Sequence, residues 1–267
     1  MNYTIVKPKK SLGQHFLRDG NILRKIVNSL ELQEGEVLLE IGAGDGSLTR
    51  LLATFPITLI AVEIDKRIIQ QLRDEFGNHV QIINKDIRSL NITELSASMR
   101  KKLRIVGNIP YYLTSDILFH IYQHHTAIAD ATLMMQREVA ERLVASPNTK
   151  EYGILSVMTQ FYCVPEILFS VSRNVFFPKP NVDSAVVHLV TKNDLPSIDE
   201  ENLKKIVRAT FGKRRKTLRN SLMYSGVEKE ALLLLDFNLE RRPESLTVTE
   251  FIQLTDQLAK QPLPRHD

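Results

Sequence analysis

The stretch that decides the fold is Glu36-Val37-Leu38-Leu39-Glu40-Ile41-Gly42-Ala43-Gly44-Asp45-Gly46, in which an apolar run passes directly into closely spaced glycines. Residues 36–41 have the apolar content of a buried strand, and residues 47–53 place three leucines on one face of a helix. A strand, a glycine-rich turn and a helix in this order are typical of nucleotide-binding α/β sheets. We therefore expect a nucleotide-binding edge where this strand ends.

The spacing of the glycines indicates which kind of nucleotide binds there. The dinucleotide-binding fingerprint would place its third glycine at position 47, where this chain has Ser47. The turn therefore favours a nucleoside that has no phosphate over a pyrophosphate. Gly42 and Gly44 are the candidate contacts, because such a ligand lies against bare backbone.

Two further predicted strands lead to acidic residues. The run 57–62 is followed by Glu63, which we expect to bind ribose hydroxyls. The run 80–84 is followed closely by Asp86, which we expect to accept a hydrogen bond from an adenine amine. Parallel strands end at one edge of a sheet, so these carboxylates are expected beside the glycine turn.

A fourth strand end carries Asn108-Ile109-Pro110-Tyr111, which follows the apolar run 103–106. The N6 amine of adenine is a poor nucleophile, because its lone pair is delocalised into the ring. The side-chain oxygen of Asn108 and the carbonyl of Pro110 are two acceptors that would orient this amine, and Tyr111 would stack on the base. The alternative is a plain strand-to-helix turn in which Pro110 ends the strand.

The rest of the chain divides into two parts. From residue 36 to about residue 191 strands and helices alternate, which predicts a parallel sheet covered on both faces, with 169–172 and 182–190 as an antiparallel edge pair. A change of composition at 192–197 marks a boundary, and the pattern beyond it is helical. We therefore predict an α/β fold: a Rossmann-like catalytic domain over 1–192 and a small C-terminal all-helical domain over 193–267.

The helical domain carries a basic run. Eight basic residues and no acidic residue lie between Lys204 and Arg219, which favours phosphate binding over an ordinary solvated helix face. The predicted RNA contacts are Lys213, Arg214, Arg215, Lys216 and Arg219. Ser225 with Glu228, and Thr247 with Glu250, predict capping boxes for two later helices.

Composition limits the setting of the protein. The 267 residues include 35 basic and 31 acidic residues and a single cysteine, which excludes an internal disulfide and fits a reducing compartment. No apolar run approaches the roughly 20 residues of a membrane span, and no signal-peptide core is present, so we expect a soluble cytoplasmic protein. His120 and His124 are spaced like metal ligands, but the rest of a zinc motif is missing, and we predict no metal.

These motifs, in this order and spacing, resemble those of S-adenosylmethionine-dependent methyltransferases. The chain is most similar to the ribosomal RNA adenine N6-dimethyltransferases, the KsgA family. The resemblance covers nearly the whole chain, and its segments are Lys10-Ser11-Leu12-Gly13-Gln14-His15-Phe16-Leu17, Glu40 to Gly44, Asn108 to Tyr111, Val175 to Val186 and Phe211 to Asn220.

The resemblance implies dimethylation of two adjacent adenosines near the 3′ end of 16S small-subunit rRNA, with S-adenosyl-L-methionine as the cofactor. It places Leu17, Asn108 and His15 near the cofactor, although the family more commonly has Asn where this chain has His15. It also places Phe176 on the target base opposite Tyr111, and leaves Phe177 for the core. The implied partner is the small ribosomal subunit with its rRNA, and we expect a monomer that binds no membrane.

Two alternatives remain open. The antibiotic-resistance methyltransferases of large-subunit rRNA share the cofactor motif and the Asn-x-Pro-Tyr motif, but residues 182–186 and 214–219 disfavour them. The other alternative is a ribosome-assembly checkpoint factor, which would act mainly by binding the immature small subunit.

Overall fold

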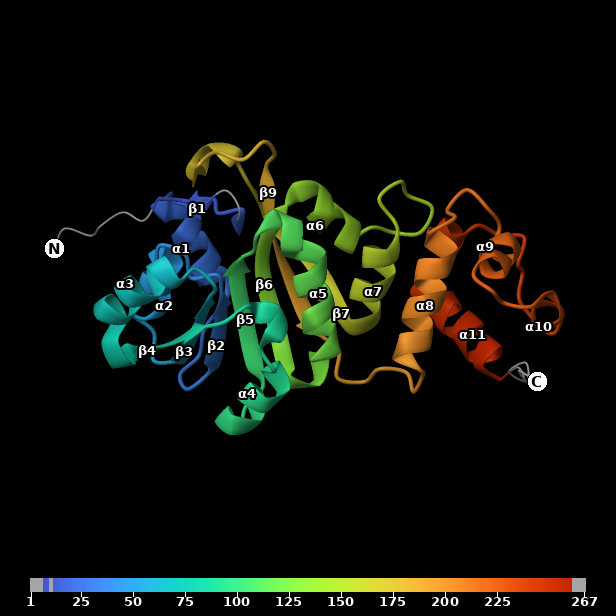
Figure 1. The fold of residues 1–267 in the computed structure, drawn as a ribbon, viewed down its shortest axis with the longest axis horizontal. Helices are drawn as coiled ribbons and strands as arrows, with labels where there is room; N and C mark the ends of the chain where they lie inside the picture. The colour runs from blue at the N-terminus through green and yellow to red at the C-terminus, as the bar shows by residue number, and fades with distance from the viewer. Residues whose placement is uncertain (1–6, 10–11, 261–267) are drawn as a thin grey trace. The chain divides into compact units, whose positions relative to one another are not determined.

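The computed structural model describes residues 7–9 and 12–260, so Lys10 and Ser11 of the first motif lie outside the described residues. The larger of its two compact units contains a seven-stranded sheet in the order β4-β3-β2-β5-β6-β9-β7 (Figure 1). The strands are β2 Val37–Ile41, β3 Thr58–Glu63, β4 Val80–Asn84, β5 Leu103–Asn108, β6 Ile128–Gln136, β7 Cys163–Val171 and β9 Ser184–Thr191. The α/β prediction and the strand-turn-helix at its centre are confirmed.

The order in which the chain connects these strands indicates where a ligand would bind. From β2 the chain moves outward through β3 to β4 and then returns to β5 on the other side of β2, and all these pairs are parallel. Ligands of open α/β sheets bind outside the carboxyl ends of the strands where the order reverses in this way. The end of β2 and the end of β5 are therefore the place to look for a site.

The helices of the first part follow the predicted pattern. They are α1 Gly20–Ser29, α2 Ser47–Leu52, α3 Lys66–Phe76, α4 Ile92–Met99, α5 Thr114–Gln123 and α6 Arg137–Leu143. Asp19 caps α1 by accepting hydrogen bonds from the N–H groups of Asn21 and Ile22. Asp65 caps α3, because its side chain accepts from the N–H of Arg67. None of the helices in the described part of the chain has the length and apolarity needed to cross a bilayer.

The antiparallel end of the sheet was predicted only in part. β9 pairs with β7 as expected, but it also pairs with β6, so of these two strands only β7 lies at an edge of the sheet. β7 begins at Cys163, earlier than the predicted residue 169, and it includes Pro165. An edge strand tolerates proline because one side of its backbone has no partner strand.

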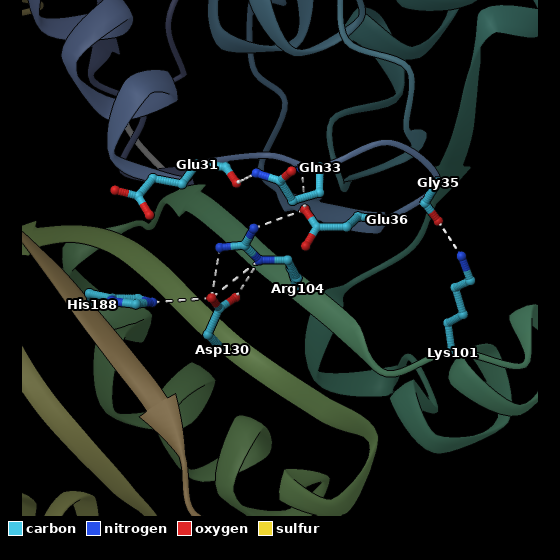
Figure 2. A network of polar contacts seen from close by, with 8 residues as sticks. All are labelled: Glu31, Gln33, Gly35, Glu36, Lys101, Arg104, Asp130 and His188. Carbon is cyan, nitrogen blue, oxygen red and sulfur yellow. Dashed lines mark hydrogen bonds and ion pairs between the residues drawn. The ribbon is translucent and has the colours of Figure 1, made fainter.

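A polar network links β5, β6 and β9 to the residue that precedes β2, near the amino ends of the parallel strands. Arg104 contacts Glu36 at 2.9 Å and Asp130 at 2.8 Å, and Asp130 also contacts His188 at 3.1 Å. Figure 2 shows Arg104 between the two carboxylates, with His188 reaching Asp130 from β9. Burial disfavours ionisation of Asp130, but hydrogen bonds from His188 and Arg104 outweigh this effect and hold the pKa of Asp130 below its ordinary value. This network lies at the opposite end of the strands from the predicted site.

The described chain forms two compact units. The chain passes from the first unit to the C-terminal helices after Asn193, which lies within the predicted boundary at 192–197. One difference concerns Glu141–Tyr162, which precedes the boundary but groups with the C-terminal helices. Tyr152 explains this grouping, since its hydroxyl donates to the carbonyl of Leu246 at 2.8 Å and its ring lies 6.1 Å from that of Phe211. The segment was placed in the catalytic domain by its position in the sequence, whereas its side chains pack in the helical unit.

The helical unit contains α7 Ile154–Tyr162, α8 Glu200–Phe211, α9 Leu218–Tyr224, α10 Lys229–Leu233 and α11 Val248–Ala259. The capping box of Thr247 and Glu250 is present at the start of α11. The box predicted for Ser225 and Glu228 is wrong. Ser225 instead ends α9, because its hydroxyl donates back to the carbonyl of Ser221 at 2.9 Å, and α10 begins after Glu228 without a side-chain cap.

Candidate active site

A cavity with an empty volume of about 870 Å³ lies at the carboxyl ends of β2, β3 and β5. It brings together residues from all four predicted strand ends and from the N-terminal motif. These residues include His15, Gly42, Gly44, Glu63, Asp86, Asn108, Pro110 and Tyr111. Neighbouring parallel strands deliver side chains far apart in the sequence to one edge, as predicted.

The glycine turn is shaped so that its backbone faces this cavity. Gly42 and Gly44 have φ angles of 75° and 54°, in the left-handed region that favours glycine. A Cβ atom on Gly44 would lie 3.1 Å from the Phe16 ring, closer than ordinary packing allows. The turn therefore presents bare backbone, which is what a nucleoside without a phosphate requires.

Backbone N–H groups donate hydrogen bonds to both carboxylate oxygens of Glu63 and hold its side chain in place. Oε2 accepts from the N–H of Gly44 at 2.9 Å, and Oε1 accepts from the N–H of Asp65 at 2.8 Å. The side chain is only 5% exposed, and this burial raises the pKa of Glu63, whereas the two N–H donors act in the opposite direction. Each carboxylate oxygen can accept a further hydrogen bond, so Glu63 is oriented to receive two hydroxyl groups.

Asp86 has a partner that sequence reasoning missed. Arg88 contacts Asp86 at 2.7 Å, and this hydrogen-bonded pair holds the pKa of Asp86 below its ordinary value. Arg88 also lines the cavity and contacts Asp116 at 3.2 Å. Asp86 is thus ionised and able to accept, but an adenine amine would share its oxygens with Arg88.

Asn108 and Pro110 retain the acceptors that the proposed chemistry needs. The Asn108 amide nitrogen donates to the backbone carbonyl of His15 at 2.9 Å, which leaves its Oδ1 atom as the acceptor. The Pro110 carbonyl accepts from the N–H of Leu113 at 3.0 Å and keeps a second lone pair. The hydroxyl of Tyr111 pairs with that of Ser184 at 2.7 Å, and burial raises the pKa of Tyr111.

The N-terminal motif closes over Tyr111. β1 Phe16–Leu17 pairs antiparallel with β8 Phe176–Phe177. The ring of His15 stacks on that of Tyr111, with centroids 5.7 Å apart and an angle of 22° between the planes. His15 Nδ1 lies 2.7 Å from the carbonyl of Pro178, so this ring nitrogen carries the proton and donates it.

The prediction that Phe177 packs in the core is wrong. Phe176 is 5% exposed and belongs to the core, whereas Phe177 is 50% exposed. Successive residues of a strand face opposite sides, so only one of the two can pack inward. Pairing with β1 turns Phe176 inward, and the guanidinium of Arg18 lies 4.5 Å from the ring centroid of Phe177.

A second cavity, with an empty volume of about 500 Å³, contains a carboxylate that sequence reasoning missed. Glu40 lines it and is 1% exposed, and burial raises its pKa to about 7 against the opposing hydrogen bond from Thr49. The hydroxyl of Thr132, also in this wall, has no hydrogen-bond partner within the described residues. Leu17 lines this smaller cavity and does not line the larger one. The only signal of this buried carboxylate in the sequence is that Glu40 is a charged residue inside an apolar run.

The five basic residues predicted to bind RNA differ in their surroundings. Lys213, Arg215 and Lys216 are exposed. Arg214 donates to the carbonyls of Thr149 and Lys150, and Arg219 contacts Glu240 at 2.8 Å. The first three are therefore the better placed to bind phosphates.

His120 and His124, which are spaced like metal ligands in the sequence, make other contacts in the structure. His120 Nε2 lies 2.9 Å from the carbonyl of Leu90, and His124 Nδ1 lies 2.8 Å from the hydroxyl of Thr93. Within residues 7–9 and 12–260, no group of three or more metal-ligating side chains comes together.

Comparison with known proteins identifies relatives over almost the whole length. Residues 5–260 match the family described as Ribosomal RNA adenine dimethylase. A protein of Chlorobium phaeobacteroides (strain BS1), named Ribosomal RNA small subunit methyltransferase A, is 44% identical over 98% of this chain and 97% of its own length. A protein of the same name from Streptococcus sanguinis is 40% identical over 96% of this chain and 93% of its own length.

Solved structures give the same picture of the fold. A dimethyladenosine transferase from Plasmodium falciparum superimposes with a TM-score of 0.78 at 25% identity, over 92% of this chain and 98% of that one. The 23S rRNA methyltransferase ErmE superimposes with a TM-score of 0.66 at 26% identity, over 92% of this chain and 100% of that one.

Proposed function

Because the chain belongs to the ribosomal RNA adenine dimethylase family, we propose that it is an S-adenosylmethionine-dependent rRNA (adenine-N6,N6)-dimethyltransferase. Its substrates are two adjacent adenosines near the 3′ end of 16S rRNA in the small ribosomal subunit, and the reaction is part of ribosome biogenesis. The observation that carries the proposal is one cavity that joins the glycine turn, Glu63 and the segment from Asn108 to Tyr111.

The residues present fit S-adenosylmethionine, which supplies a methyl group on a positively charged sulfur. The turn at Gly42 and Gly44 offers bare backbone, and Glu63 offers two oriented oxygens for the ribose hydroxyls. Asp86 is the acceptor for the adenine amine. His15 and Leu17 are assigned, with Asn108, to the methionine end.

Asn108 and Pro110 would orient the target amine. Their two oxygens each accept one N6 hydrogen, which holds the nitrogen lone pair in the direction of attack. Such orientation contributes roughly 7–11 kcal/mol in favourable cases, so the chemistry requires no strong base. The proton leaves after the nitrogen has become cationic, when it is far more acidic.

Aromatic side chains would hold the flipped base. Tyr111 stacks on it, and His15 already occupies one position on the Tyr111 ring. The family role of Phe176, which is to stack on the opposite face of the base, requires this buried ring to move out of the core when RNA binds.

The helical domain would bind rRNA away from the reacting base. We assign catalysis and cofactor binding to residues 1–192 and RNA binding to residues 193–267, with the packing of Glu141–Tyr162 extending the second part. Lys213, Arg215 and Lys216 are the main phosphate contacts, and Arg214 and Arg219 also position the loop. We infer that the protein acts as a monomer in the cytoplasm, where small subunits are assembled.

The test is to incubate the protein with labelled S-adenosylmethionine and small subunits that lack the modification, and then to map the modified bases. We expect dimethylation of two adjacent adenosines near the 3′ end of 16S rRNA. Large subunits are the matched control, because the structural relative ErmE is named for 23S rRNA. Label found only in the large subunit would overturn the proposal.

A further inference from the structure

An exposed pair of side chains, Arg18 and Phe177, lies beside the active site. The guanidinium carbon of Arg18 is 4.5 Å from the ring centroid of Phe177, which is 50% exposed. Phe177 pairs with Phe16 across β1 and β8, and the N–H of Arg18 donates to the carbonyl of Val175 at 3.1 Å. These backbone hydrogen bonds thus hold the Arg18 and Phe177 side chains next to each other.

The pair adjoins the residues that hold the target base. The residue after Phe177 is Pro178, whose carbonyl contacts His15, and the ring of His15 stacks on Tyr111. Neither Arg18 nor Phe177 lines the cofactor cavity. The pair therefore lies next to the base site without contributing to the cofactor site.

Two properties of the pair suit a ligand. No carboxylate in residues 7–9 and 12–260 forms an ion pair with Arg18. Phe177 exposes half of a large apolar side chain, although the neighbouring Phe176 is almost completely buried. An uncompensated guanidinium and an exposed ring are the groups that bind nucleotides, because the ring stacks on a base and the guanidinium binds phosphate with two hydrogen bonds.

We propose that Arg18 and Phe177 bind the nucleotide adjacent to the target adenosine, with Phe177 on its base and Arg18 on its phosphate. This inference rests on the proposed function, because it takes RNA as the substrate. When one of the two adjacent adenosines is held as the target base at Tyr111, the other adenosine is the adjacent nucleotide. The pair is thus a positioning site for the second adenosine during modification of the first.

The first experiment measures methylation kinetics on unmodified small subunits. Phe177→Ala should raise KM for subunits about tenfold, the effect expected for one lost base stack, and change kcat much less. Arg18→Gln should also raise KM, whereas Phe177→Tyr should restore the wild-type value. Calorimetry should give the wild-type affinity for S-adenosylmethionine in every variant.

A matched control is Lys25→Gln. Lys25 Nζ lies 4.1 Å from the ring centroid of Phe169, so this change also removes one exposed cation from an aromatic pair. Neither residue lines the active-site cavity. We expect Lys25→Gln to have the kinetics of the wild type. If Lys25→Gln raised KM as much as Arg18→Gln does, the effect of Arg18 would come only from the loss of a positive charge, and the inference would be overturned.

The second experiment removes the adjacent base. Small subunits are reconstituted with rRNA that carries an abasic nucleotide in place of one of the two adenosines. The wild type should lose as much on this substrate as Phe177→Ala loses on the normal one, and the variant should lose nothing more. Additive losses, or an unchanged KM for Phe177→Ala, would overturn the inference. A wild type that methylates no adenosine even on normal, unmodified small subunits would instead refute the proposed function.

Discussion

The side-chain amide of Asn108 donates to the backbone carbonyl of His15 across 2.9 Å, and this contact joins the end of β5 to the N-terminal motif. The amide nitrogen is thereby engaged, and the Oδ1 atom is left to accept from the target amine. An asparagine is needed here, because it supplies a donor for His15 and an acceptor for the substrate on one planar group.

The first prediction concerns this residue. Asn108→Ala should lower kcat by about 100-fold or more, because the lost acceptor acts mainly in the transition state. The affinity for S-adenosylmethionine, measured by calorimetry, should fall much less than kcat. Activity within a few-fold of the wild type would remove Asn108 from the orienting role. Full restoration of subunit assembly by this variant in a deletion strain would support a separate checkpoint activity.

The second prediction concerns Glu63. Glu63→Ala should weaken S-adenosylmethionine binding by about 10- to 100-fold, the effect of losing hydrogen bonds to a charged group. Glu63→Gln is the matched control for shape, and it should retain part of the affinity because one oxygen remains. Unchanged calorimetric affinity in both variants would place the ribose elsewhere.

The third prediction concerns the buried carboxylate of Glu40. Its pKa of about 7 lies above the ordinary value of 4.5, so its contribution to stability is fully present below pH 4.5 and is lost as the pH rises through 7. Glu40→Gln remains uncharged, so its stability relative to the wild type should rise over this range by roughly 3 kcal/mol. Urea unfolding of both proteins between about pH 5 and pH 8 measures this difference. Parallel pH profiles would show that Glu40 has an ordinary pKa.

The fourth prediction concerns the basic run. A triple change of Lys213, Arg215 and Lys216 to Gln should flatten the salt dependence of binding to small subunits. The slope of log K against log[salt] should fall by up to about 0.9 for each lost phosphate contact. Lys229→Gln on α10 is the control, since it removes an exposed lysine outside the run. A triple variant with the wild-type slope would assign the run to surface solvation.

The fifth prediction concerns the network around Arg104. Arg104→Met should destabilise the protein by roughly 3 kcal/mol near neutral pH, because it leaves Glu36 and Asp130 without their cation. The pKa of Asp130 is lowered in the folded protein, so its stabilising effect is present above its unfolded pKa and is lost as the pH falls through its folded value. The deficit of the variant should therefore shrink in acid. Chemical unfolding at several pH values tests this, and an equal deficit at every pH would contradict it.

Much of the candidate site could be predicted from the sequence, because local patterns determine it. An apolar run followed by glycines predicts a strand that ends in a turn, and Gly42 and Gly44 adopt the left-handed angles that glycine favours. Glu63 and Asn108 end parallel strands of the same sheet, so the edge on which they meet follows from the fold class.

The tertiary structure alone decided the contacts between distant segments. His15 and Pro178 are 163 residues apart in the sequence, yet their contact and the pairing of β1 with β8 determine that Phe176 is buried and Phe177 is exposed. Both residues have the same side chain, so no local pattern distinguishes them. The raised pKa of Glu40 and the pairing of Asp86 with Arg88 likewise depend on burial and distance in the folded chain. Short-range periodicity identifies an element and its buried face, whereas the environment of a side chain is set by whichever distant residues pack against it.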